Sequence, residues 1–80
     1  MAPTAAERRM INMERGTFLD LCKKYCMGDE SVFVKCRGIK YNPVAYELTF
    51  DPKGRAVHYV YLLSGAGDPV RELLGNIENV

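Results

Sequence analysis

Residues 31–63 are dense in β-branched and aromatic residues, and turn-forming residues interrupt them at only two places. Such side chains favour strands because they pack well on a pleated surface. The first interruption, Arg37-Gly38, suits a tight hairpin turn, since glycine accepts the positive φ that such a turn needs. The second, residues 51–54 (Asp-Pro-Lys-Gly), combines a side-chain acceptor, a fixed φ and a glycine that can close a bulged hairpin. The sequence therefore predicts a small antiparallel sheet of three or four strands.

A hairpin closed by Asp51 and Arg55 fixes which residues face each other on the two flanking strands. Counting outward predicts a core face with four pairs: Phe50 with Ala56, Leu48 with His58, Tyr46 with Val60, and Val44 with Leu62. Because side chains alternate between faces, the opposite face carries Thr49 with Val57, Glu47 with Tyr59, and Ala45 with Tyr61.

The first hairpin is out of phase with this pattern. Ile39 and Tyr41 alternate with each other but not with Val44, so a one-residue slip is expected at Asn42-Pro43, where proline cannot donate to the ladder. The turn at Arg37-Gly38 predicts Val34 opposite Tyr41 and Lys35 opposite Lys40. This register brings together a basic patch: Lys35, Arg37 and Lys40.

Size and composition limit the possible classes of protein. A chain of 80 residues forms one domain, and a domain of this size buries only roughly 60–65% of its unfolded surface. The net charge of +1 gives no general attraction to nucleic acid or membranes. No apolar run approaches the roughly 20 residues that span a bilayer, and no secretory signal is recognisable. Three cysteines, an odd number, fit reduced thiols, so we expect a cytoplasmic protein without membrane contact.

The segments on either side of the predicted sheet are expected to be helical, after a disordered tail over residues 1–12. Residues 13–80 form the predicted single α+β domain. Thr17, with Asp20 in the first turn, predicts an N-cap, and Gly28 can stop the helix. The expected apolar side of this helix consists of Phe18, Leu21, Cys22 and Tyr25.

The second predicted helix begins at Asp68-Pro69, which provides an N-cap followed by proline at the first helical position. Its apolar stripe would be Val70, Leu73, Leu74 and Ile77. Gly75 interrupts this short helix, so it has to dock, either on its own sheet or on another chain.

The sequence contains residue types used in metal binding and catalysis, but not in a pattern that predicts either. Three cysteines and the single histidine are the right types for a tetrahedral zinc site, but their spacing lacks a short Cys-x-x-Cys hairpin: Cys22, Cys26, Cys36 and His58. His58 as a general base, alone or with Cys36 as nucleophile, would need a positioned partner and a pocket. We therefore expect no enzyme activity, no catalytic residue, no metal and no cofactor.

Two surfaces remain as candidates for binding. Tyr59 and Tyr61, with Val57 and Glu47 beside them, form an aromatic face that a helix covers or that contacts a protein partner, including a second copy of the chain. An exposed strand edge is a further way to bind a protein. The alternative function is nucleic-acid binding, with Lys35, Arg37 and Lys40 contacting phosphates and nearby tyrosines stacking on bases.

One segment resembles a known group of proteins. The residues that carry the resemblance are Gly38-Ile39-x-Tyr41-x-Pro43-Val44-Ala45-Tyr46-Glu47-Leu48-x-Phe50-Asp51, followed by Gly54 and His58. This pattern is similar to small uncharacterised proteins of conjugative and phage-like mobile elements of Firmicutes. The resemblance covers about a third of the chain and implies no catalytic residues. It implies an accessory protein of a mobile element or phage in a bacterial cytoplasm, whose partner could be a host defence nuclease, as for anti-CRISPR or anti-restriction proteins.

Overall fold

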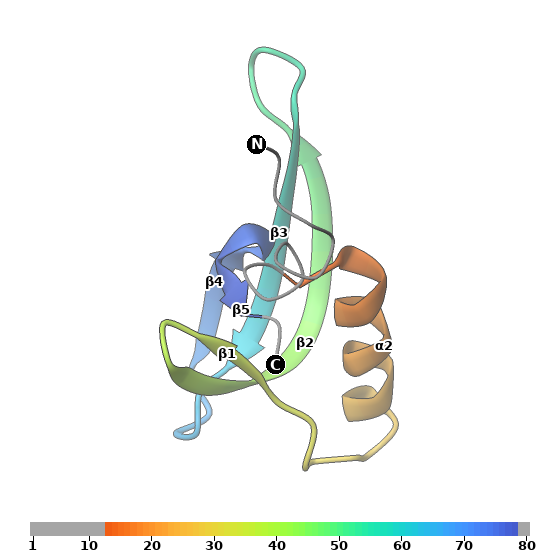
Figure 1. The fold of residues 1–80 in the computed structure, drawn as a ribbon, viewed down its shortest axis with the longest axis vertical. Coiled ribbons are helices and arrows are strands. Elements are labelled where there is room, and N and C mark those ends of the chain that lie inside the picture. Colours follow the sequence, from red (N-terminus) through yellow and green to blue (C-terminus); the bar gives the residue numbers. More distant parts are fainter. Residues whose placement is uncertain (1–12, 79–80) are drawn as a thin grey trace, which may run out of the picture.

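The computed structural model describes residues 13–78, which form one α-helix and a five-stranded antiparallel sheet (Figure 1). The elements in chain order are α2 (Arg15–Cys26), β1 (Val34–Cys36), β2 (Ile39–Phe50), β3 (Ala56–Leu63), β4 (Pro69–Leu73), the 3-10 turn η1 (Leu74–Asn76) and β5 (Ile77–Glu78). The predicted antiparallel α+β class is confirmed, but the sheet has five strands rather than three or four. The predicted tail over residues 1–12 lies outside the described residues.

The prediction of a C-terminal helix is wrong. Residues 69–73 form β4, which pairs with β3 in a register that runs from Tyr59↔Leu73 to Leu63↔Pro69. Exposure alternates along β4, with Val70 and Glu72 half-buried between exposed neighbours. Val70, Leu73, Leu74 and Ile77 have a helical spacing in the sequence although they lie in β4, η1 and β5. The turn η1 interrupts the two-residue alternation of a strand after Leu73. The edge of β3 also satisfies the backbone of β4, whereas a short helix containing Gly75 would be marginal in water.

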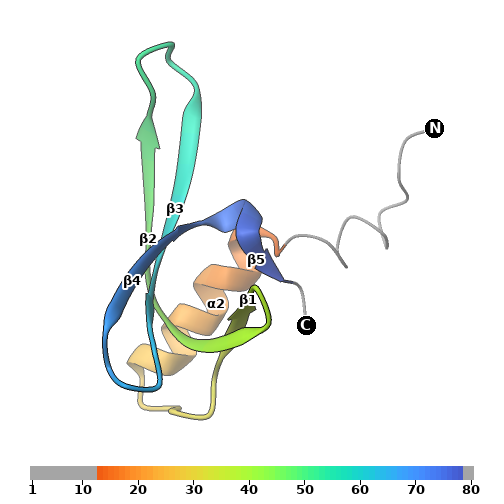
Figure 2. The same ribbon diagram turned by 90° about the vertical axis from the view of Figure 1, so that its left-hand side faces the viewer.

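The order of the strands requires a curled sheet. The order is β4-β3-β2-β1-β5, so β4 and β5 lie at opposite edges although only three residues, Leu74–Asn76, separate them in the chain. In a flat sheet the two edges would be about 19 Å apart, at about 4.8 Å per strand. The four Cα steps from Leu73 to Ile77 span at most about 14 Å. The sheet therefore curves until its edges approach each other, as Figure 2 shows for β4, η1 and β5.

Helix α2 packs on the inner side of this curved sheet. The buried core joins residues before and within α2 to residues from the strands and η1: Met13, Phe18, Cys22, Val34, Cys36, Val60, Leu62, Leu74 and Ile77. Phe18 and Cys22 are buried as predicted, and Leu21 packs against the core. The helix begins at Arg15, after an N-cap residue Glu14 that makes no side-chain capping bond, so the predicted cap at Thr17 is wrong. The predicted stop is confirmed, because α2 ends at Cys26 and Gly28 has a φ of 110°.

The first hairpin adopts the expected register throughout, and the second adopts it from its turn as far as Ala45↔Tyr61. Val34 lies opposite Tyr41 and Lys35 opposite Lys40, and the intervening Arg37 and Gly38 have φ values of 53° and 78°. Positive φ at both central positions is the signature of a tight hairpin turn that matches the twist of the strands.

The second hairpin is confirmed from Phe50↔Ala56 to Ala45↔Tyr61, and the register shifts between Pro43 and Ala45. The slip was expected at Asn42-Pro43, and it falls at Val44. As a result Pro43, not Val44, lies opposite Leu62.

The β2–β3 hairpin extends beyond the body of the protein, and we call residues 48–57 the arm (Figures 1 and 2). Phe50 and Leu48 face the same side of the sheet as Val60 and Leu62, yet they are 64% and 44% exposed. Their placement on the predicted face is correct, but neither side chain belongs to the core that the described residues form. At the tip, the carboxylate of Asp51 accepts hydrogen bonds from the backbone N–H groups of Lys53 and Arg55.

The α-helix found within residues 13–78 is too short and too polar to cross a membrane.

Candidate functional site

The aromatic face predicted around Tyr59 and Tyr61 lies on the outer side of β2, β3 and β4. Tyr59 faces Glu47 on one side and Leu73 on the other, while Tyr61 lies between Ala45 and Arg71. We call the four predicted residues Glu47, Val57, Tyr59 and Tyr61, together with Arg71 of β4, the tyrosine face. The contribution of β4 is not foreseen from the sequence, because the spacing of the apolar residues from Val70 onward predicts a helix there. The exposure of Pro69–Leu73 alternates in the folded chain, but its half-buried positions are Val70 and Glu72, so the sequence shows no matching alternation of apolar and polar residues.

Two polar contacts hold the tyrosines in place. The hydroxyl of Tyr61 donates a hydrogen bond to Oε1 of Glu47 over 3.0 Å. The guanidinium of Arg71 lies 4.3 Å from the centre of the Tyr59 ring, a distance at which a cation is attracted to the face of an aromatic ring. Both rings therefore keep a defined orientation at the surface, which lowers the conformational entropy that a partner would have to remove.

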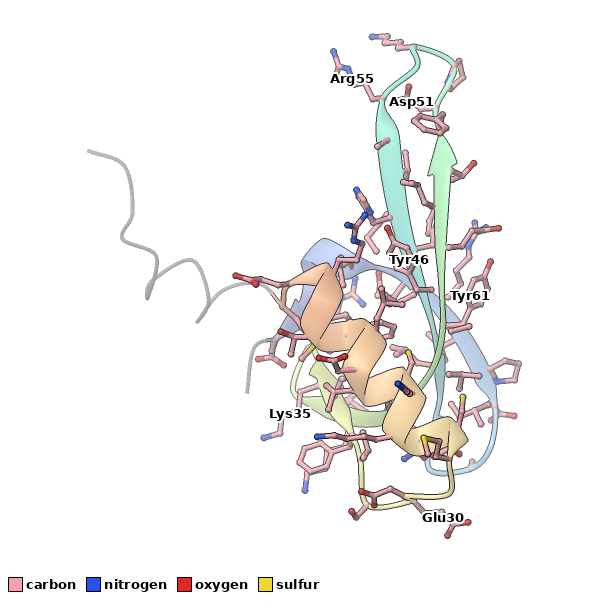
Figure 3. All side chains as sticks on the ribbon, turned by 90° about the vertical axis from the view of Figure 1, so that its right-hand side faces the viewer. Glu30, Lys35, Tyr46, Asp51, Arg55 and Tyr61 are labelled. Carbon is pink, nitrogen blue, oxygen red and sulfur yellow. The ribbon has the colours of Figure 1, made fainter. Side chains whose placement is uncertain are left out.

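Helix α2 does not cover this face. Its buried residues Phe18 and Cys22 join Val60 and Leu62, which alternate with Tyr59 and Tyr61 along β3 and so point to the other side. In Figure 3, Tyr61 points away from α2, while Tyr46 lies on the side of the helix. The sequence left two hypotheses for this face: that a helix covers it, or that it is open to a partner. The arrangement of the described residues favours the second hypothesis.

One of the three cations of the predicted basic patch, Arg37, is paired with an acidic side chain of β4, and a second acidic residue, Glu78 of β5, lies across the sheet from Lys35. Arg37 donates to Oε2 of Glu72 over 2.5 Å. Lys40 lies 4.6 Å from the ring centre of Phe33. The sequence brings the three cations together correctly but does not place Glu72 beside Arg37, because Glu72 lies in the segment predicted to be a helix.

Glu72 connects three parts of the fold. Besides Arg37, its carboxylate accepts a hydrogen bond from Nδ2 of Asn76 over 2.8 Å and one from the N–H of Leu73 over 3.3 Å. The bond from Arg37, followed by that from Asn76, lowers the pKa of Glu72 to about 2. This residue thus links the first hairpin turn to β4 and η1, where the two edges of the sheet approach each other.

The cysteines do not come together with His58 as a zinc set. Cys22 and Cys36 are buried in the core, whereas Cys26 is exposed and its thiol donates to the carbonyl of Val44. Burial, followed by the proximity of Cys26, raises the pKa of the Cys22 thiol to about 11. Within residues 13–78, no group of three or more His, Cys, Asp or Glu side chains is arranged to hold a metal ion.

His58 forms a pair with Tyr46 at the margin of the core. The Tyr46 hydroxyl and Nδ1 of His58 are 2.5 Å apart. His58 also lines an open pocket of about 400 Å³ between the start of β3 and η1, whose apolar lining includes Met13, Val57 and Leu74. The pocket could not be foreseen, because it depends on the turn that replaces the predicted helix.

The comparisons with known proteins returned no family model, no curated protein and no solved structure that matches this chain.

Proposed function

We propose that this chain is a small non-enzymatic protein-binding module whose contact surface is the tyrosine face. The observation that carries the proposal is the orientation of Tyr59 and Tyr61, fixed by Arg71 and Glu47 on a face that α2 leaves open. Tyrosine provides a large apolar area with a polar tip at little entropic cost, which is why it is frequent in the energetic centres of interfaces.

The non-enzymatic part of the proposal is supported by the state of the candidate nucleophile. Cys36, the thiol considered as a partner of His58, is buried in the core, and this burial raises the pKa of its thiol. A thiol with a raised pKa carries little thiolate, the form that acts as a nucleophile. Protein binding does not need such groups.

The resemblance of residues 38–51 to proteins of mobile elements and phages suggests the class of partner. A host defence nuclease, bound as anti-CRISPR or anti-restriction proteins bind theirs, fits a small accessory protein of a bacterial cytoplasm. This partner class rests on the resemblance and on context, while the surface rests on geometry.

The test is a pull-down from bacterial lysate, with and without nuclease treatment. The double variant Tyr59→Ala, Tyr61→Ala is compared with the wild type and with Tyr25→Ala, a half-buried helix tyrosine outside the face. We expect a protein that survives nuclease treatment, that is lost with the double variant and that is kept by Tyr25→Ala. Circular dichroism confirms that each variant is folded.

Two results would contradict the proposal. A catch that vanishes after nuclease treatment, and that Lys35→Glu with Lys40→Glu also removes, would favour the nucleic-acid alternative. Equal retention by the wild type and the double variant would exclude the tyrosine face as the contact surface.

A further inference from the structure

The arm has a strand edge that the fold leaves open. β4 pairs with β3 only from Tyr59 to Leu63, while β3 begins at Ala56. Residues 56–58 therefore pair with β2 on one side, and no strand within residues 13–78 lies on their other side. We call residues 56–58 the open edge.

The hydrogen-bond phase of the hairpin determines which backbone groups face this edge. The N–H of Asp51 donates to the carbonyl of Arg55 over 2.9 Å, so this pair is bonded across the hairpin. Bonded pairs alternate with non-bonded pairs in an antiparallel ladder. Ala56 is the next residue along β3, and its N–H and C=O consequently point away from β2, toward the open edge.

Apolar side chains lie on the inner side of the arm, one strand away from the open edge. Phe50 lies opposite Ala56 and is 64% exposed, and Leu48 lies opposite His58 and is 44% exposed. The open pocket of about 400 Å³ is lined by all three residues of the open edge and continues to Leu74. An added strand would place every second side chain against this apolar surface.

The charges at the tip indicate the other feature of the partner. Lys53 and Arg55 form no ion pair among the described residues, and both are exposed. The carboxylate of Asp51 between them already accepts hydrogen bonds from their backbone N–H groups. The two side-chain cations at this end of the edge are therefore complementary to an acidic residue.

We propose that the open edge binds an extended peptide segment of another protein, which adds to the arm as a further strand in line with β4. Backbone hydrogen bonds to Ala56 supply affinity, an apolar side chain packs beside Phe50, and an acidic residue at one end meets Lys53 and Arg55. This site is separate from the side chains of Tyr59 and Tyr61, which lie on the outer face. Val57 belongs to both surfaces, so the test does not use it.

The probe is a fluorescein-labelled peptide of about six residues, the usual length of a strand, in which valine alternates with threonine and the last residues are aspartate. Its binding is followed by fluorescence anisotropy and by the amide NMR signals of the full chain. We expect saturable binding, with shifted signals and slowed amide exchange at Ala56. Because Ala56→Pro removes one donor, it should weaken binding about fivefold, as for the loss of one backbone hydrogen bond.

The controls separate this site from the tyrosine face. Phe50→Ser should weaken the binding of the probe, whereas Leu19→Ser, which changes an apolar residue on α2 that is 42% exposed, should not. Tyr59→Ala with Tyr61→Ala should also leave probe binding unchanged. Should Ala56→Pro unfold the protein, the exchange rate of the Ala56 amide in the wild type, with and without peptide, still tests the contact.

Three outcomes would overturn the proposal. The first is the absence of saturable binding or of any change at Ala56. The second is equal binding of a peptide with lysine in place of aspartate. The third is self-association of the chain, with the same amides perturbed in the absence of peptide, which would make a second copy the occupant of the open edge.

Discussion

Replacing Glu72 with glutamine should destabilise the protein at neutral pH but not in strong acid. The change keeps the shape of the side chain and removes the charge that attracts Arg37. We expect the free energy of unfolding to fall by about 1 kcal/mol at pH 7 and by almost nothing near pH 2.

The magnitude follows from the pKa of Glu72, which is lowered from its ordinary value of 4.5 to about 2. A pKa difference of one between the folded and unfolded states corresponds to about 1.36 kcal/mol, so the contribution of Glu72 to the free energy of unfolding is at most about 3.4 kcal/mol. The side chain of Arg37 is 67% exposed, so solvent screens the pair and reduces the gain to about 1 kcal/mol. A loss of 1 kcal/mol lowers the melting temperature of a domain of this size by roughly 4–8 °C.

The sign of the pH dependence is fixed by the direction of the pKa change. Because the folded state holds the lower pKa, the unfolded chain binds more protons between pH 4.5 and 2. The contribution of Glu72 is therefore complete above about pH 5 and is lost as the pH falls through this window. In the glutamine variant this part of the acid sensitivity is missing.

Thermal unfolding followed by circular dichroism between pH 7 and pH 2 measures the effect. The exposed Glu30, changed to glutamine, is the matched control and should give the wild-type curve. A stability difference between wild type and Glu72→Gln that stays constant down to pH 2 would refute the electrostatic reasoning and would indicate loss of packing instead. The difference should also shrink in strong salt, since the pair is exposed on one side.

Three further predictions concern the thiols, a turn and the core. Cys26 should react with iodoacetamide well before the buried Cys22, whose pKa is raised to about 11; equal labelling of the two in the folded protein, measured by mass spectrometry, would contradict this. Gly54→Ala should cost about 1 kcal/mol in urea unfolding, because Gly54 has a φ of 79° and an added Cβ would meet no atom within 4 Å, so the cost is conformational. Leu62→Ala should cost about 2–5 kcal/mol and Phe50→Ala under about 1 kcal/mol, although both face the same side of the sheet; similar losses in urea unfolding would mean that the arm belongs to the core.

Local chemistry made the two hairpins predictable from the sequence. The Asp51 turn and the Arg37-Gly38 turn each fix a register within a few residues, and alternation then assigns every neighbouring side chain to a face. The tyrosine face was found in this way. The burial of those faces was not predictable, because Phe50 and Leu62 have the same pattern and differ only in whether another element reaches them.

The C-terminal strands were missed because their structure depends on distant partners. Val70, Leu73, Leu74 and Ile77 satisfy a helical spacing when read alone, and Asp68-Pro69 resembles a helix start. Pairing of β4 with β3 and of β5 with β1 overrides this local preference. For the same reason the sequence could not show the ion pair between Arg37 and Glu72, or the open edge that β4 leaves when it ends at Leu73.

The pairing of β5 with β1 also constrains when the protein can fold during its synthesis. Lys35 and Cys36 pair with Glu78 and Ile77, and the N–H of Met13 donates to the carbonyl of Ile77. When residues 13–63 have emerged from the ribosome, the helix and both hairpins are available. β5, which pairs with β1 and accepts the hydrogen bond from Met13, is not yet available. Contacts between residues far apart in the sequence also slow folding, because the chain loses the entropy of closing a long loop before these contacts can stabilise it. We expect the nascent chain to remain open, with its inner apolar surface accessible to chaperones, until residues 77 and 78 leave the exit tunnel.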